Sequence, residues 1–161
     1  MSARMIRLAE SNSGLSIRCV LLDVAAPQSA DFLWRLAGTD AAYEAIHAMW
    51  TGPEISCPLP AGGLPEELAV SDLPQENATS FPDAGDIVVA FAAAGSLKGL
   101  PPGNFFDVGI FYGSGGRLFM PFGWLKGNVA AQILAEDMDA AKTACSRIRA
   151  NGACRLCFER I

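Results

Sequence analysis

Residues 105–116 read FFDVGIFYGSGG, a strongly apolar run that ends in a glycine-rich turn. Apolar runs of this length that are bounded by turn residues are typical of buried β-strands. The turn at residues 113–116 reverses the chain, so residues 117–119 are predicted to pair back as the second arm of a hairpin. This stretch therefore predicts a buried β-strand and a mainly β architecture.

The segments on either side repeat the pattern. Gly85 and Asp86 form a turn that leads into the apolar run IVVAF, and in the N-terminal segment LSIRCVL apolar and polar residues alternate. Alternation with a period of two indicates a strand with one buried face. Sixteen Gly and ten Pro residues agree with a chain that has many turns. The further strands are predicted at residues 4–10, 14–23, 87–91, 128–134 and 154–161.

Two short helices are predicted. The first opens at Pro27 and ends at Gly38, with large apolar residues at helical spacing between them. The second spans residues 135–150, where Asp137 or Asp139 can serve the N-terminus and arginines fall late in the segment. Helices of this length are long enough to cover the ends of a β structure.

Two other segments are ambiguous from the pattern alone. The Ala and Glu content of residues 41–50 (AAYEAIHAMW) favours a helix, whereas a period of two predicts a strand. Residues 58–84 contain five prolines and few periodic apolar positions, so we predict a long excursion with at most short ordered pieces. Such an excursion is either a functional rim or a decorative insertion.

The length of the chain indicates the number of domains, and its charge limits the kinds of binding partner. The chain has 161 residues and no linker or repeat, so residues 1–161 are predicted to form a single domain. The formal net charge is −5, which argues against a nucleic-acid partner. No Lys or Arg lies between Arg35 and Lys98, a stretch rich in carboxylates. This stretch is either a solvated acidic loop or an acidic rim that favours amine ligands.

The sequence also bears on compartment and cofactors. It has no secretory signal and no apolar run near the ~20 residues of a membrane helix, so we predict a soluble, cytoplasmic protein without a membrane partner. The five cysteines are an odd number, which argues for reduced thiols. Cys154 and Cys157 are spaced as Cys-x-x-Cys but fall in a predicted strand, so they are interpreted as structural. With a single His we expect no metal and no cofactor.

The order of motifs in the second half carries a family resemblance. Gly85-Asp86-Ile87 precedes an apolar strand and a Pro/Gly loop, and Ile110-Phe111-Tyr112-Gly113 follows. A connector then leads to Gly127-Asn128-Val129, a helix with an acidic start and a final strand that bears arginines. The segment AMWTGPE at residues 48–54 is similar to a strand that ends in a Trp-(Ser/Thr)-Gly-Glu turn, although Pro53 interrupts the Gly-Glu step. Over most of residues 14–161 the sequence resembles the DUF3830 family of uncharacterised bacterial proteins with a cyclophilin-like fold.

The resemblance implies a mainly β fold, a closed or nearly closed cyclophilin-like barrel with one or two short capping helices. It also implies that residues 41–50 are a strand. The activity of true cyclophilins does not follow, because these enzymes use an Arg in a Phe-His-Arg-type strand. The only His here is His47, and no Arg lies between Arg35 and Arg117. Prolyl isomerase activity is therefore not expected.

His47 and Glu54 are the candidate catalytic residues. Together they could supply the general base and its orienting carboxylate in a hydrolase or isomerase. The alternative is a hydrogen-bonded His in a half-buried strand. No nucleophile motif such as Gly-x-Ser-x-Gly accompanies the pair, which favours the structural interpretation.

A binding role is the preferred interpretation, because the sequence contains no complete catalytic set. Large apolar residues in the connector at residues 120–124 are less needed for packing than those in strands. They could form a pocket at the barrel mouth for a small amide, amine or peptide-like ligand, or they could simply cap the barrel. Self-association through an exposed apolar patch also stays open. The candidate ligand-binding residues are Trp50, Glu54, Phe122, Trp124 and Asn128.

Overall fold

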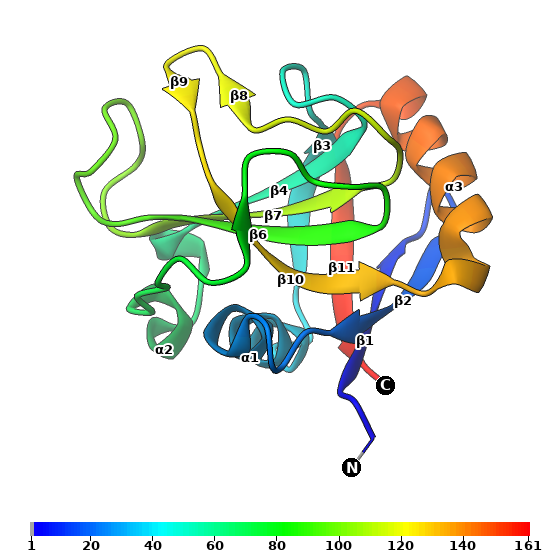
Figure 1. Cartoon of the computed structure of the whole chain (residues 1–161), viewed down its shortest axis with the longest axis horizontal. Coiled ribbons are helices and arrows are strands. Elements are labelled where there is room, and N and C mark those ends of the chain that lie inside the picture. The colour runs from blue at the N-terminus through cyan, green and yellow to red at the C-terminus, as the bar shows by residue number, and fades with distance from the viewer. Residues whose placement is uncertain (1) are drawn as a thin grey trace.

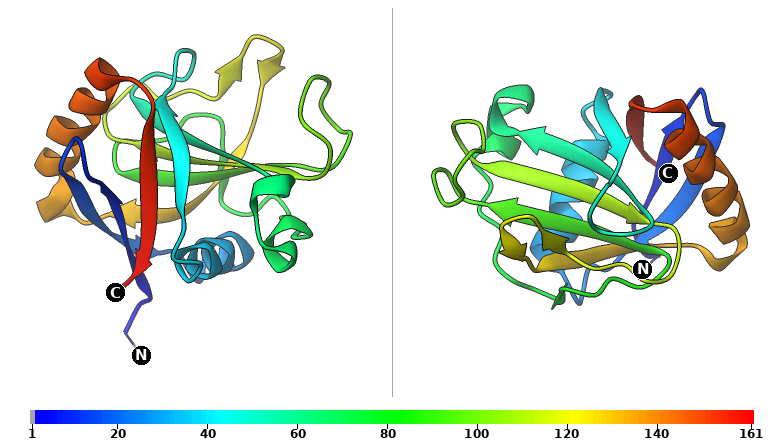
Figure 2. Two further views of the ribbon diagram at one scale, coloured as in Figure 1. Left: turned by 180° about the vertical axis from the view of Figure 1, so that it is seen from behind. Right: turned by 90° about the horizontal axis from the view of Figure 1, so that it is seen from above.

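The computed structural model describes residues 2–161, which form a closed antiparallel β-barrel (Figures 1 and 2). Around the barrel the strand order is β2-β1-β11-β3-β4-β7-β6-β10, and β10 pairs back onto β2. In Figure 2, left, β1, β11 and β3 run side by side. The wall strands are β1 (Met5–Glu10), β2 (Leu15–Leu21), β3 (Ala42–His47), β4 (Glu54–Pro60), β6 (Asp86–Ala92), β7 (Phe105–Phe111), β10 (Gly127–Ile133) and β11 (Cys154–Arg160).

The alternation predicted from sequence sets the two faces of the wall. In β4, Ile55, Cys57 and Leu59 are buried in the barrel core, so Glu54 and Ser56 face outward. Within the ambiguous segment at residues 41–50, Ala42–His47 form strand β3, as the resemblance implied, whereas residues 48–50 lie beyond the end of the strand. Its pairing with β11 on one side and β4 on the other overrides its helix propensity.

Barrel closure depends on an irregularity in β10. The pairing of β10 with β6 shifts register between Val129 and Ala131, as a β-bulge does. A bulge bends its strand, and β10 continues from this point to pair with β2 through three residue pairs. The carbonyl of Ala130 accepts a hydrogen bond from the backbone N–H of Leu22 at 2.9 Å, just past the end of β2.

Two helices cover opposite ends of the barrel, as predicted (Figure 1). Helix α1 (Pro27–Ala37) buries Phe32, which stacks on Phe106 of β7 with ring centroids 4.6 Å apart. Helix α3 (Met138–Asn151) buries a face of small and apolar residues and ends at Gly152, where φ is +93°. Asp137 and Asp139 lie at the start of this helix, as predicted, with Asp137 at the N-cap position and Asp139 in the first turn, but the side chain of Asp137 does not cap the helix. Its carboxylate binds Arg18 of β2 instead, at 2.8 Å.

The excursion at residues 58–84 contains short ordered pieces, as predicted. After β4 it forms the single-turn helix α2 (Glu66–Ala69) and the two-residue strand β5 (Ala78–Thr79), which pairs with β10. The side-chain amide of Asn128 holds the excursion to the barrel. It donates to the carbonyl of Pro74 at 2.8 Å and accepts from the N–H of Glu76 at 3.1 Å.

The hairpin predicted for residues 117–119 was wrong. Strand β7 is paired with β4 on one edge and β6 on the other, so it has no free edge for a returning arm. The backbone N–H groups of Arg117 and Leu118 bind the carbonyls of Thr51 and Ser80 instead. The short strands β8 (Phe119–Met120) and β9 (Gly123–Trp124) then pair with each other. Within residues 2–161, no helix has both the length and the apolar character needed to cross a membrane.

Candidate functional site

An apolar groove of about 350 Å³ lies on the outer face of strands β4, β7 and β6. The inner face of these strands is filled by the barrel core, so the groove uses the outward positions of the same strands. Apolar grooves of this size with a few polar groups are typical small-ligand sites. Its roof comes from two connecting segments, which contribute Leu97, Leu100, Met120, Phe122 and Leu125.

Two carboxyl groups, Glu54 and Asp107, lie in the floor of this groove. In the register of β4 with β7, Ser56 and Gly109 form the residue pair between them. Each carboxyl accepts one hydroxyl: Thr51 Oγ1 donates to Glu54 Oε1 at 2.5 Å, and Ser56 Oγ donates to Asp107 Oδ2 at 2.6 Å. Glu54 is 6% exposed. The floor therefore holds an acid pair that is shielded from water on the barrel side.

Burial raises the pKa of both carboxyl groups above their ordinary values. The negative charge of Asp107 raises the pKa of Glu54 further, because two like charges close together disfavour joint ionisation. Within residues 2–161, neither group forms a salt bridge with a Lys or Arg. The pair therefore tends to retain a proton in conditions where exposed carboxylates are fully ionised.

Gly109 makes room for the Glu54 carboxylate. A Cβ atom built at this position would overlap Oε2 of Glu54 and would lie 3.0 Å from the ring of Phe111. The glycine is needed here for space, since its φ is not in the positive range. Any larger residue at position 109 would push the carboxylate out of its place over the strand.

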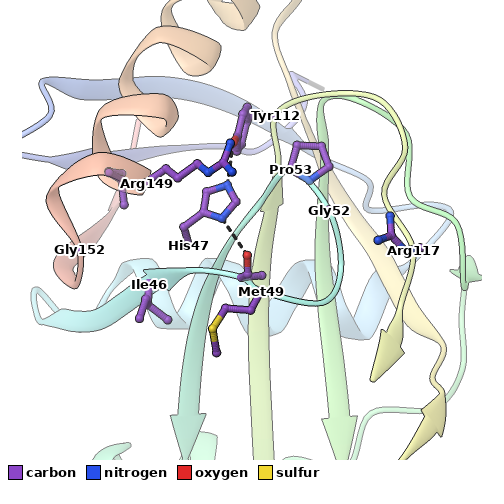
Figure 3. A pocket seen from close by; sticks show the side chains of 11 residues that line it. Ile46, His47, Met49, Gly52, Pro53, Tyr112, Arg117, Arg149 and Gly152 are labelled. Atoms are coloured by element: carbon purple, nitrogen blue, oxygen red, sulfur yellow. Dashed lines mark hydrogen bonds between the residues drawn. The ribbon is translucent and has the colours of Figure 1, made fainter. Parts of the chain in front are cut away.

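His47 is held by two hydrogen bonds, neither of them to Glu54. Its Nδ1 lies 2.8 Å from the carbonyl oxygen of Ala48, and its Nε2 lies 2.7 Å from the hydroxyl of Tyr112 (Figure 3). His47 and Glu54 both line the groove. The structure thus brings the two candidate catalytic residues to one site without the base–carboxylate contact that the sequence suggested.

The structure gathers three of the five candidate ligand-binding residues. Trp50, Glu54 and Phe122 line the groove, whereas Trp124 and Asn128 do not. Trp124 packs in an aromatic cluster, with its ring centroid 4.8 Å from that of Phe119 and 5.2 Å from that of Phe81. Asn128 is 5% exposed and binds the excursion.

The position of the groove also differs from the prediction. The three residues meet on the outer wall of the barrel, not at its mouth. The physical reason is that the interior is filled by side chains of the strands and by helix α1, so Glu54 can only be accommodated facing outward.

Sequence reasoning missed Asp107, Thr51 and Ser56. Asp107 had a recognisable signal, because a charged residue inside the apolar run FFDVGIF is unusual and a buried polar residue is informative. Thr51 and Ser56 had none, since their roles follow from the register of β4 with β7. Among residues 2–161, no three or more His, Cys, Asp or Glu side chains come together as a metal site would require.

The fold defines the class of this protein: it is a mainly β, closed antiparallel barrel with capping helices, as the family resemblance implied. The chain belongs to the family described as "Protein of unknown function (DUF3830)", whose model matches residues 8–159. The family resemblance seen in the sequence is thereby confirmed.

Two solved structures are similar to the chain. McbB, solved in complex with tryptophan, has a TM-score of 0.58 and 17% sequence identity, and the match covers 94% of this chain but 44% of McbB. This chain thus spans less than half the length of McbB. A cyclophilin-type peptidyl-prolyl cis-trans isomerase from Cryptosporidium parvum has a TM-score of 0.49 and 12% identity, with 99% and 98% of the two chains covered. No curated protein matches the sequence.

Proposed function

We propose that this protein binds a small-molecule or peptide-like ligand in the outer-wall groove, and that the ligand presents an amine to the acid pair. The observation that carries the proposal is the pair itself: within residues 2–161, Glu54 and Asp107 form no salt bridge in this apolar groove, although Lys126 also lines it. Apolar walls supply affinity, and a few polar groups fix the orientation of a ligand.

The charge of the pair favours an amine over an acid or a neutral alcohol. An ammonium group placed between Glu54 and Asp107 would offset the burial that raises the pKa of both carboxyls and the repulsion by Asp107 that raises the pKa of Glu54 further. Both carboxyls could then ionise, so binding should release a proton to solvent. Charge-assisted hydrogen bonds of this kind are about twice as strong as neutral ones.

The test compares three probes with the same ring: phenethylamine, 2-phenylethanol and 3-phenylpropionate. Isothermal titration calorimetry in two buffers of different ionisation enthalpy measures both affinity and proton release. We expect phenethylamine to bind with proton release and the other two probes to bind at least about tenfold more weakly, which corresponds to about 1.4 kcal/mol.

Variants locate the effect in the groove. Glu54→Gln and Asp107→Asn should each weaken amine binding and remove the proton release. Glu44→Gln is the matched control, because Glu44 is an exposed carboxylate on the neighbouring strand β3 and does not line the groove. Equal binding of the alcohol and the amine, or equal effects of the groove variants and the control, would contradict the proposal.

A second candidate is an enzyme, a hydrolase or isomerase that uses Glu54 with His47. It is favoured by one observation, the raised pKa of a carboxyl in an apolar groove, which is what a general acid needs near neutral pH. The Glu54→Gln variant separates the two functions once a ligand is known. An enzyme would lose about 10²–10⁴-fold in turnover, whereas a binding protein has no turnover to lose.

A further inference from the structure

A second cavity, of about 610 Å³, opens at the end of the barrel beside α3. It lies on the other side of the segment at residues 46–49, which lines both this end cavity and the groove. Figure 3 shows Arg149 reaching from α3 toward the same opening as His47 and Tyr112. The lining holds two arginines, one histidine and one tyrosine, and it holds no Asp or Glu.

The two arginines are not neutralised by the protein. In the part of the chain that the structure describes, neither Arg117 nor Arg149 forms a salt bridge. Arg117 makes one weak contact, from Nη1 to the carbonyl of Gly115 at 3.4 Å. Two free guanidinium groups at one cavity are unexpected on a chain with a net charge of −5. Guanidinium groups match the geometry of carboxylate and phosphate oxygens.

The direction of the hydrogen bond between His47 and Tyr112 depends on whether His47 is protonated. The carbonyl of Ala48 can only accept, so Nδ1 of His47 carries a hydrogen. In the neutral imidazole, Nε2 then accepts the hydroxyl hydrogen of Tyr112 at 2.7 Å. When His47 is protonated, Nε2 donates to the Tyr112 oxygen, and the hydroxyl hydrogen becomes free to point at a ligand.

The surroundings of this pair agree with a role in binding an anion. Burial raises the pKa of Tyr112, so its hydroxyl stays protonated at neutral pH. Arg149 and the buried thiol of Cys145 face Tyr112 from α3, and Arg117 faces the cavity from the segment after β7. Glu54 lies on the groove side of His47.

We propose that the end cavity is a second ligand site, for a small oxyanion that is bound by Arg149 and the Tyr112 hydroxyl, while Arg117 adds positive charge at the far side of the opening (Figure 3). Binding is stronger when His47 is protonated, because protonation adds a positive charge and frees the hydroxyl donor. This site shares residues 46–49 with the amine site in the groove but is distinct from it, since its cationic lining selects ligands of the opposite charge.

The test is calorimetric titration of the whole chain with sodium sulfate and with sodium benzoate, at constant ionic strength and at pH 5.5 and 7.5. Sulfate keeps its charge over this range, so a change in its affinity reports on the protein. We expect saturable binding that is stronger at pH 5.5. Binding of sulfate alone would assign the site to phosphate-like anions, and binding of benzoate would assign it to carboxylates.

Substitutions separate the cavity from the general charge of the protein. Arg149→Gln should weaken binding by about 10–100-fold, the range for a lost hydrogen bond to a charged group. Lys142→Gln removes the same charge from an exposed position of the same helix outside the cavity, and should change little. His47→Gln should abolish the pH dependence, because it removes the group whose protonation adds the charge and frees the hydroxyl, and Tyr112→Phe should weaken binding by loss of the hydroxyl donor.

Two results would overturn the proposal. One is the absence of saturable binding of both anions at pH 5.5 and 7.5, with the fold checked by circular dichroism. The other is an equal loss in Arg149→Gln and Lys142→Gln, which would show a diffuse electrostatic effect. Failure of amine binding in the groove would leave this proposal untouched, because the probes and the variants differ.

Discussion

Replacing Gly109 by Ala tests whether the Glu54 carboxylate occupies the place that the structure gives it. The added Cβ would overlap Oε2 of Glu54 and would lie 3.0 Å from its Cδ, shorter than the ~3.5–4.0 Å of an ordinary contact between carbon atoms. The carboxyl group must therefore move away and break its hydrogen bond with Thr51. When a buried group such as the Glu54 carboxyl loses its hydrogen-bond partner, the free energy of unfolding falls by about 1–3 kcal/mol.

The steric overlap destabilises the folded state by about 1–3 kcal/mol more. Ala also restricts the unfolded chain more than Gly does, and this offsets the destabilisation by about 0.4–1 kcal/mol. We expect Gly109→Ala to lower the free energy of unfolding by about 2–4 kcal/mol as the net of these costs. In a Glu54→Ala background the carboxylate is absent, and of the three nearest atoms only the one in the Phe111 ring is left, 3.0 Å from the new Cβ. There the same substitution should cost about 1 kcal/mol or less, because a ring can shift by a few tenths of an ångström.

Urea denaturation of the four proteins of this double-mutant cycle measures the coupling. The midpoints give the free energies if the slope m stays constant across the set. The coupling energy between positions 54 and 109 should be about 2 kcal/mol, well above the ~0.5 kcal/mol scatter for independent sites. A cost for Gly109→Ala that is equal in both backgrounds would refute this placement of Glu54.

Three further predictions concern pH and the anchoring of the excursion. Burial raises the pKa of Glu54 above its ordinary 4.5, so the folded state holds a proton that the unfolded chain releases. The free energy of unfolding of the wild type should therefore fall as pH rises above about 4.5. Urea titrations at pH 4.5 and 8 should show a smaller fall for Glu54→Gln. Hydrogen bonds from Arg18 lower the pKa of Asp137 to about 2, from 3.8. Asp137→Asn should therefore cost about 1 kcal/mol at pH 7, and the difference from wild type should shrink as pH falls from 4 toward 2. Asn128→Ala should lower the free energy of unfolding by about 1–3 kcal/mol. It should speed amide hydrogen exchange near Glu76 more than in the barrel strands. Unchanged exchange near Glu76 would show that the excursion is held by other contacts.

Most strands of the fold could be predicted from the sequence, because the alternation of apolar and polar residues and the turn residues are local signals. The exception is instructive: the arm predicted after the turn at residues 113–116 failed because both edges of β7 are occupied by strands far away in the sequence. Strand neighbours of this kind are set by topology. No local pattern in FFDVGIFYGSGG reveals that β7 is a central strand with two partners.

The site was less accessible to sequence reasoning for a related reason. Glu54 was found because it follows a recognisable turn, and Trp50 and Phe122 because large aromatic residues near loops are conspicuous. Asp107 was not chosen, although its place in an apolar strand is a signal, because its contact with Ser56 depends on the register between β4 and β7. Asn128 is polar and buried as a ligand anchor would be, yet its partners are backbone groups of the excursion and the hydroxyl of Ser29 in helix α1.

The two faces of β4 have a consequence for laboratory evolution. Ile55, Cys57 and Leu59 point into the core, while Glu54 and Ser56 point into the groove. A library that randomises the even-numbered positions of this strand would change the chemistry of the groove, whereas leaving the odd-numbered positions unchanged would keep the core intact. Selection for new specificity and selection for stability can thus act on alternate residues of a single seven-residue strand.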